Sequence, residues 1–123
     1  MIRGIRGAIT VDTNKEEEIL DATERLLREM VKQNDIHADD VASVFVSATE
    51  DITAAFPAKA LRRLDGWTYV PVMCMRELSI ENSLERCIRV MMHVNTNKSQ
   101  QEIQHIYLEK AVVLRPDLTK KNA

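Results

Sequence analysis

The chain is poor in aromatic residues and in cysteine, and it has no long apolar run. Aromatic residues make up 4% of its 123 residues, so the core has to be built mainly from Val, Ile, Leu, Met and Ala. No run of about 18 apolar residues is present, which excludes a transmembrane helix. The N-terminal MIRGIRGAITV also lacks the apolar stretch and cleavage site of a signal peptide. Cys74 and Cys87 show no metal or redox spacing, so we expect free thiols in a cytoplasmic protein.

An excess of positive charge is absent as well. The net charge is −2 and the pI is about 5.9, which argues against a nucleic-acid partner and against binding to an anionic membrane. The sequence has no glycine-rich phosphate loop, no GxSxG and no CxxC, and His93 and His105 lack the spacing of metal ligands. We therefore expect no metal site.

The residues that are present fit a single domain spanning 1–123, with 45% hydrophobic and 29% charged residues. Apolar residues at helical spacing predict a long helix over 14–34, preceded by the capping-box pattern Thr13-x-x-Glu16. A short helix is expected over 55–64, and Ser99-x-x-Glu102 favours one more helical turn.

Five apolar, β-branched runs predict the strands of a sheet. They span 2–11, 41–49, 67–75, 87–95 and 105–114. Pro71 forbids one ladder hydrogen bond, which places part of its strand at an edge or a bulge. The expected fold is α/β (α+β): a mixed five-stranded sheet with one long helix and short helices.

One helix of this length cannot cover both faces of a five-stranded sheet. The runs 41–49 and 87–95 are apolar on both faces, so a second layer is needed. Another copy of the chain in a closed symmetric oligomer would supply it. The alternative is that the short helices and the C-terminal tail suffice.

A charge interrupts the apolar run CIRVMMHV. Burying the guanidinium of Arg89 costs several kcal/mol unless it is paired. Arg6 and Tyr107 also lie on predicted strands, and two guanidinium forks on rigid elements suit a dicarboxylate. The alternative is a structural role, with the arginines paired to Glu77 or Glu109. Composition and pattern therefore lead only to an oligomeric domain with arginine pockets for a small anion.

Five stretches, taken in order, resemble a known family. They are RGIRGAITV (3–11), FPAKALRRL (56–64), YVPVMCMREL (69–78), CIRVMMHV (87–94) and HIYLEKAVVLRPDL (105–118), and they resemble the monofunctional chorismate mutases of the trimeric pseudo-α/β-barrel type. The resemblance implies a homotrimer with active sites in clefts between subunits. It also implies the Claisen rearrangement of chorismate to prephenate in phenylalanine and tyrosine biosynthesis, which needs no nucleophile, no general base and no cofactor.

The resemblance also implies roles for particular residues. Arg89 would donate to the ether oxygen and a carboxylate, while Glu77 and Cys74 would contact the ring hydroxyl side. The remaining residues would bind the substrate: Arg6 and Tyr107 at the enolpyruvyl carboxylate, Met73, Met75 and Arg76 along the pocket wall, and Phe56, Lys59, Arg62, Leu114 and Arg115 at the mouth and lid. Met73 departs from the family pattern, since some members have a polar residue there. The sequence has no extra segment of the kind that usually carries a feedback site, so we expect no regulation by aromatic amino acids.

The sequence pattern is also compatible with other functions. The trimeric enamine or imine deaminases also use an interface arginine, but they must activate water on an imine. A non-catalytic trimeric metabolite-binding protein is a second alternative, and a structural trimer with internal salt bridges is a third. The set Arg6, Cys74, Glu77, Arg89 and Tyr107 favours the mutase, because a binding protein needs no donor at the ether oxygen.

Overall fold

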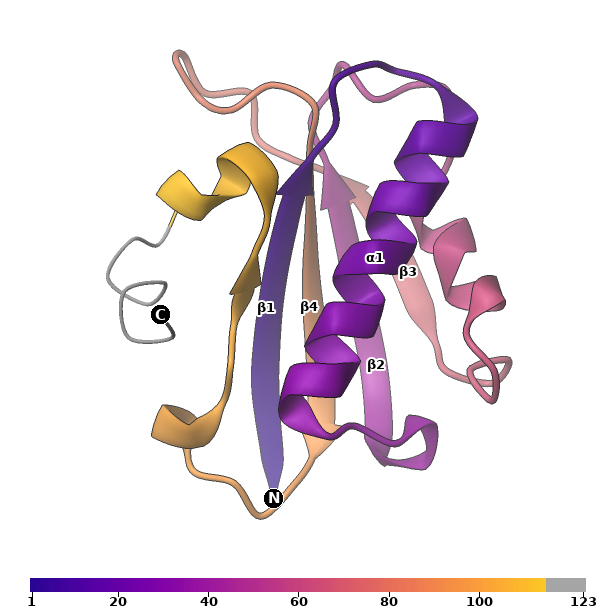
Figure 1. The fold of residues 1–123 in the computed structure, drawn as a ribbon, viewed down its shortest axis with the longest axis vertical. Helices are drawn as coiled ribbons and strands as arrows, with labels where there is room; N and C mark the ends of the chain where they lie inside the picture. Colours follow the sequence, from indigo (N-terminus) through magenta and orange to yellow (C-terminus); the bar gives the residue numbers. More distant parts are fainter. Residues whose placement is uncertain (115–123) are drawn as a thin grey trace.

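The computed structural model of the chain describes residues 1–114. It forms a mixed five-stranded sheet of order β3-β2-β4-β1-β5, with the long helix α1 packed on one face (Figure 1). The strands are β1 (Ile2–Thr10), β2 (Val41–Ala48), β3 (Val72–Arg76), β4 (Cys87–Asn95) and β5 (Ile106–Tyr107). Strand β4 is antiparallel to both β1 and β2, while β1–β5 and β2–β3 are parallel. The predicted α+β sheet is confirmed.

Helix α1 (Glu16–Asn34) forms because its apolar residues fall on one stripe. Ile19, Leu26 and Met30 are fully buried on that stripe and pack on the sheet. The helix approaches β1 at Gly7, where a Cβ atom would lie 2.5 Å from the Met30 sulfur. Glycine at this position therefore sets the close spacing of helix and sheet.

The predicted capping box at the start of α1 is wrong. The N-cap residue is Lys15, which makes no side-chain cap, and the Thr13 hydroxyl donates to Glu18 instead of capping the helix. Glu18 also accepts the Asp12 N–H at 2.7 Å, so this carboxylate holds the connection from β1. These hydrogen bonds, the Thr13 hydroxyl first, lower the pKa of Glu18. The second predicted box is confirmed, since Ser99 and Glu102 cap the 3₁₀ turn η3 (Gln100–Glu102) reciprocally.

Two strands are shorter in the structure than the sequence predicted. The run 67–75 is extended only from Val72, because the chain turns at Trp67 and Val70. The run 105–114 contributes only the two residues of β5 and continues as the 3₁₀ helix η4 (Glu109–Val113). Glu109 has a φ of 54° and pairs with Arg25 of α1 at 2.6 Å, so it does not share a strand face with Tyr107.

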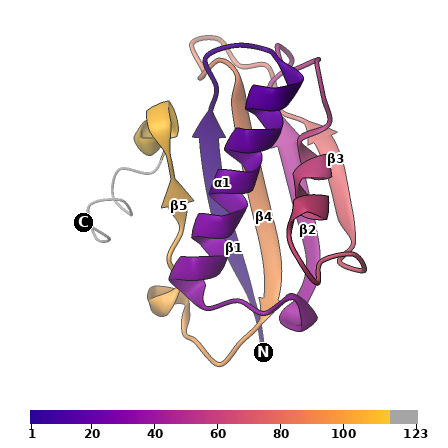
Figure 2. The ribbon, with the colours of Figure 1, turned by 45° about the vertical axis from the view of Figure 1, so that its right-hand side comes forward.

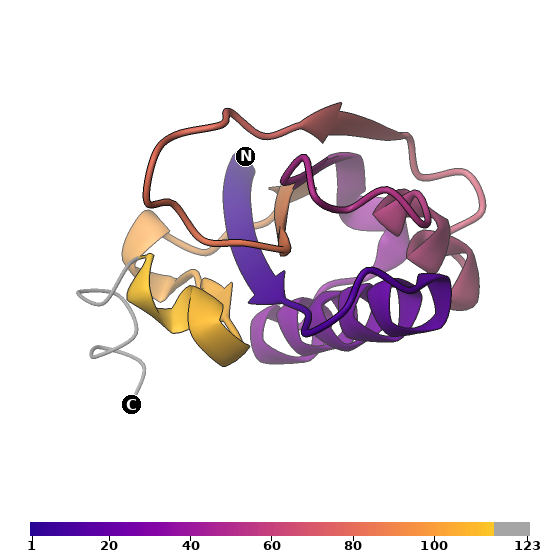
Figure 3. The same ribbon diagram turned by 90° about the horizontal axis from the view of Figure 1, so that it is seen from above.

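The two faces of the sheet differ in their cover. Helix α1 and the 3₁₀ helix η2 (Pro57–Arg63) lie on the same side (Figure 2), where Ile88, Val90 and Met92 of β4 are buried. We call the opposite side the open face. Figure 3 shows that the segment between β3 and β4 arches away from α1. Large apolar side chains stay uncovered by residues 1–114 on the open face: Phe45 is 38% exposed and Met73 is 61% exposed.

Candidate active site

A cavity of about 560 Å³ opens on this face of the sheet. It collects side chains from all five strands and from the residues just after β3. Seven of the thirteen predicted site residues line it: Arg6, Met75, Arg76, Glu77, Arg89, Tyr107 and Leu114. Most of these residues stand on strands, so the strands hold their side chains at fixed separations.

Arg89 is the cation at the centre of the cavity. It lies opposite Ala8 of β1 and Ser47 of β2, so the strand alternation places it on the open face. Its side chain is 46% exposed, and its Nε atom lies 3.3 Å from Glu77 Oε2. Within residues 1–114, Arg89 forms no ion pair with a carboxylate other than Glu77. Arg89 therefore meets Glu77 on one side and is open to a ligand on the other.

Arg6 is a second cation beside the cavity. Its backbone N–H donates to His105 Nδ1 at 3.0 Å, which ties β1 to the segment leading into β5. Its guanidinium makes no ion pair within the described part of the chain. Tyr107 is 8% exposed and packs with Ala8 and Cys87. A cation without a counterion next to a phenol suits a carboxylate ligand.

The charge of the cavity is set by few groups. Burial raises the pKa of the Cys87 thiol, which lies beside Arg89, so this thiol is neutral at pH 7. Arg76 is paired with Glu50 at 2.5 Å, outside the cavity centre. Arg6 and Arg89 thus outnumber the single carboxylate of Glu77, and the site favours an anion.

Four predicted site residues lie elsewhere in the chain. Phe56, Lys59, Arg62 and Cys74 line a separate hollow of about 640 Å³ together with Trp67 and Val72. Cys74 alternates with Met75 along β3 and packs against the main core, so it lies on the helix side of the sheet. The structure does not bring these four residues to Arg89 within one chain. Met73 is exposed and lines neither hollow, and Arg115 lies outside the described residues.

Ser47 is a residue of the cavity that the sequence analysis missed. Its hydroxyl donates to Glu77 Oε2 at 2.6 Å. Phe45 and Met91, which face each other across β2 and β4, are further lining residues. The alternation of 41–49 places Ser47 on one face, but only the register of β2 with β4 puts it opposite Arg89. The sequence contains no direct signal for that register.

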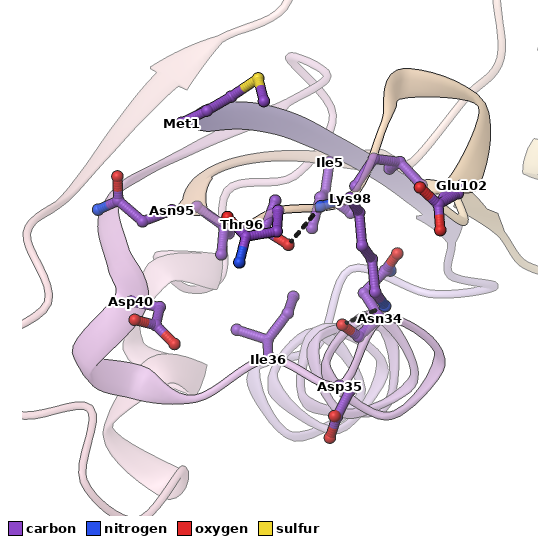
Figure 4. Close-up of a pocket in the computed structure, with 13 residues that line it drawn as sticks. Met1, Ile5, Asn34, Asp35, Ile36, Asp40, Asn95, Thr96, Lys98 and Glu102 are labelled. Atoms are coloured by element: carbon purple, nitrogen blue, oxygen red, sulfur yellow. Dashed lines mark hydrogen bonds between the residues drawn. The ribbon is translucent and has the colours of Figure 1, made fainter.

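Another hollow, of about 620 Å³, lies at the opposite end of the sheet (Figure 4). Its central polar residue is Asn34, the last residue of α1, which is 4% exposed. The Asn34 amide donates to the carbonyls of Met30 and Gln104, and its Oδ1 accepts the Gln104 N–H. Lys98 Nζ donates to the Asn34 carbonyl at 2.8 Å. These contacts anchor the end of α1, so we assign this hollow a structural role.

The described residues contain few other groups that could bind a metal or a membrane. Within residues 1–114, no group of three or more His, Cys, Asp or Glu side chains could hold a metal ion. No helix in that part of the chain is long and apolar enough to cross a membrane. Cys74 and Cys87 are both free thiols.

Comparisons with known proteins agree with one another. Residues 2–118 match the family described as chorismate mutase type I. The chorismate mutase AroH of Bacillus subtilis is 55% identical over 97% of this chain and 94% of its own length. AroH of Thermus thermophilus is 46% identical over 96% of this chain and 97% of its own length. A solved chorismate mutase from Clostridium thermocellum superposes with a TM-score of 0.87 at 49% identity, covering 90% of this chain and 98% of that one.

Proposed function

Because this chain belongs to the type I chorismate mutase family, it is an isomerase that rearranges chorismate to prephenate, and we propose that it does so in the cavity of Arg6, Glu77 and Arg89. The observation that carries this proposal is the pair of strand-borne guanidiniums beside one carboxylate. Chorismate is a flexible dianion, and the rearrangement requires its compact conformer. Two fixed cations hold such a conformer by positioning its carboxylates.

Arg89 is the group that we assign to the transition state. Glu77 is its one ion-pair partner within residues 1–114 and its side chain is 46% exposed, so its terminal nitrogens can donate to the ether oxygen as the C–O bond breaks. Even modest enzymatic acceleration requires about 8 kcal/mol. A donor aimed at charge that develops in the transition state supplies about 3–4 kcal/mol. Arg89 would therefore make the largest single contribution.

The other residues of the site act on the two ends of the substrate. Arg6 and Tyr107 would hold the carboxylate of the enolpyruvyl group, because both line the cavity and stand on the paired strands β1 and β5. Glu77 and Cys74 would face the ring hydroxyl side, where positive charge develops. Phe56, Lys59, Arg62, Leu114 and Arg115 would form the mouth, with the basic residues attracting the dianion. Met73, Met75 and Arg76 would line the wall.

We further propose that residues 1–123 form one catalytic domain that assembles as a homotrimer. Two observations support this assembly. The exposed apolar side chains on the open face need a cover. In addition, Phe56, Lys59, Arg62 and Cys74 lie at the β3 margin of the sheet, while Arg6 and Tyr107 lie at the β1–β5 margin. A head-to-tail contact between these two margins would complete each site and close into a ring.

The decisive experiment combines activity with mass. Purified protein is mixed with chorismate, whose loss is followed by ultraviolet absorbance, while light scattering on a sizing column gives the molar mass. We expect conversion to prephenate by a particle of three 14.1-kDa chains, about 42 kDa. An active monomer would contradict the shared site, and a trimer that binds chorismate unchanged would be a metabolite-binding protein instead. Free Cys74 and Cys87 support a cytoplasmic location, which cell fractionation would test.

A further inference from the structure

Ser47 holds a position that joins the two charged residues of the cavity. It lies on β2 directly opposite Arg89 of β4, and it is also paired with Met75 of β3. Its hydroxyl donates to Glu77 Oε2 at 2.6 Å, and the neighbouring Ala48 carbonyl accepts the Glu77 N–H at 2.9 Å. Two consecutive residues of β2 therefore fix both the backbone and the carboxylate of Glu77, although Glu77 lies beyond the end of β3.

The two contacts to the Glu77 carboxylate fall on the same oxygen. Oε2 accepts the Ser47 hydroxyl and faces Arg89 Nε at 3.3 Å. Oε1 receives no hydrogen bond from residues 1–114, and the Glu77 side chain, which is 26% exposed, lines the cavity. Within that part of the chain Glu77 is also the one ion-pair partner of Arg89, whose side chain is 46% exposed.

Without the Ser47 hydroxyl, the Glu77 carboxylate could adopt a second arrangement with Arg89. A carboxylate and a guanidinium form a two-point ion pair when neither is held by another group. Such a pair would take up Oε1 of Glu77 and a terminal nitrogen of Arg89 together. The cavity would then offer fewer free groups to the substrate, even though every charged residue was still present.

We propose that Ser47 is a positioning residue for the rearrangement: its hydroxyl holds Glu77 in a one-point contact with Arg89 and so keeps both groups free for the substrate. The inference rests on the proposed function of the Arg89–Glu77 cavity. Ser47 itself need not touch the substrate. It acts through Glu77, whereas a residue that only stabilised the strand would have the same effect whether or not Glu77 was present.

The test compares Ser47→Ala with Ser47→Thr and with Ser43→Ala. Ser43 is a matched control, because it lies on the same face of the same strand, is also half-buried, and is hydrogen-bonded to His93 at 3.1 Å. We expect kcat of Ser47→Ala to fall on the order of tenfold, the loss expected for one hydrogen bond to a charged group, with a smaller change in KM. Ser47→Thr should retain most of the activity, and Ser43→Ala should stay within about twofold of wild type.

A second arm repeats Ser47→Ala in a Glu77→Ala background. If Ser47 acts through Glu77, removing its hydroxyl there should cost little further in kcat/KM. The same tenfold loss in both backgrounds, an unaffected kcat in Ser47→Ala, or an equal loss in Ser43→Ala would overturn the proposal. Thermal melts of each variant show whether a loss of activity is due to unfolding. If Ser47→Ala is unfolded, the activity of Ser47→Thr and the comparison in the Glu77→Ala background still test the proposal. Wild-type conversion with silence in Arg89→Ala would uphold the proposed function whatever the result at Ser47.

Discussion

At the scale of single residues, the site depends on which groups are paired and which are left free. Within residues 1–114, Arg89 has one ion-pair partner, Glu77, at 3.3 Å, whereas Arg63 is hydrogen-bonded to both Asp21 and Glu24 on the helix side. Those hydrogen bonds, that to Asp21 first, raise the pKa of Arg63, and its ion pairs serve only the surface of α1 and η2. The arginine that we propose for catalysis thus differs from Arg63 in having fewer carboxylate partners, a property that the residue type alone does not reveal.

Replacing Arg89 should impair turnover more than substrate affinity. We expect Arg89→Ala to lose about 10²–10³-fold in kcat, because the donor acts on charge that grows in the transition state. Arg89→Lys should also lose most of its activity, since a point charge does not replace a planar fork. Steady-state kinetics with chorismate would measure both losses. Arg28→Ala is the control, because Arg28 pairs with Glu24 on α1 and lies outside the cavity.

An equal loss in kcat at Arg62 and at Arg89 would count against this ranking. Arg62 is exposed, lines the hollow of about 640 Å³ and is assigned to the mouth, so its removal should raise KM more than it lowers kcat.

The Cys87 thiol should react slowly with thiol reagents. Burial raises its pKa, so less thiolate is present at pH 8 than for an ordinary cysteine, and the thiolate is the reactive form. In a Cys74→Ser variant, the one remaining thiol should label at least about tenfold more slowly in the folded protein than in denaturant, and its rate should rise with pH. The Cys87→Ser variant reports on Cys74, which is partly exposed. Fast labelling of folded Cys74→Ser would show that Cys87 is accessible.

At the scale of elements, the sequence predicted the regular parts well and the irregular parts poorly. The helix predicted over 14–34 and the strands over 41–49 and 87–95 match α1, β2 and β4 closely, because periodic burial determines them. The run 105–114 is equally apolar, yet Glu109 takes a positive φ and directs the chain into η4. Local composition does not encode that turn, since glutamate seldom favours it.

The candidate site was predictable in part for the same reason. The residues of the cavity stand on strands that the pattern identified, and their roles came from the family resemblance. The contact between Ser47 and Glu77 depends on the pairing of β2 with its neighbours, which involves segments far apart in the sequence. The separation of Cys74 from Met75 likewise depends on the face of β3 that each side chain takes, whereas Lys59 and Arg62 are kept from the cavity because η2 packs on the helix side.

The end of α1 should be a sensitive point for stability. Asn34→Ala would leave the partly buried N–H and C=O groups of Gln104 without their side-chain partner, and we expect a loss of about 1–3 kcal/mol in the free energy of unfolding. Gln33→Ala is the control: Gln33 is exposed, bonds only Glu29 along the helix, and should cost less than about 0.5 kcal/mol. Urea titrations at one fixed protein concentration would compare them. Equal losses at both positions would show that the anchor is not specific.

At the scale of the whole molecule, the open face should decide both assembly and activity. Phe45 lies on this face with its ring edge-on to His93 at 5.5 Å, and it also lines the cavity. A charge there would be costly to bury in an interface. We expect Phe45→Asp to shift the protein from trimer towards monomer and to lower kcat/KM by at least about tenfold, as measured by light scattering and the chorismate assay.

Gln33→Asp is the matched control for assembly, since it adds the same charge on the exposed surface of α1. It should remain trimeric and active. A Phe45→Asp monomer with full activity would refute the shared site.

The order of strands in the sheet has a consequence for synthesis on the ribosome. Within residues 1–114, strand β1 pairs with β4 and β5 alone, so its hydrogen-bonding edges find no strand partner there until 85 more residues have followed Thr10, up to the end of β4 at Asn95. At ordinary elongation rates, that wait is roughly 4–17 seconds. During this time β1 is an unprotected aggregation-prone strand. Two arginines and two glycines interrupt the apolar residues of β1 and would limit association of nascent chains. Arg6, which we propose as a substrate-binding residue, would therefore also reduce aggregation before the site has formed.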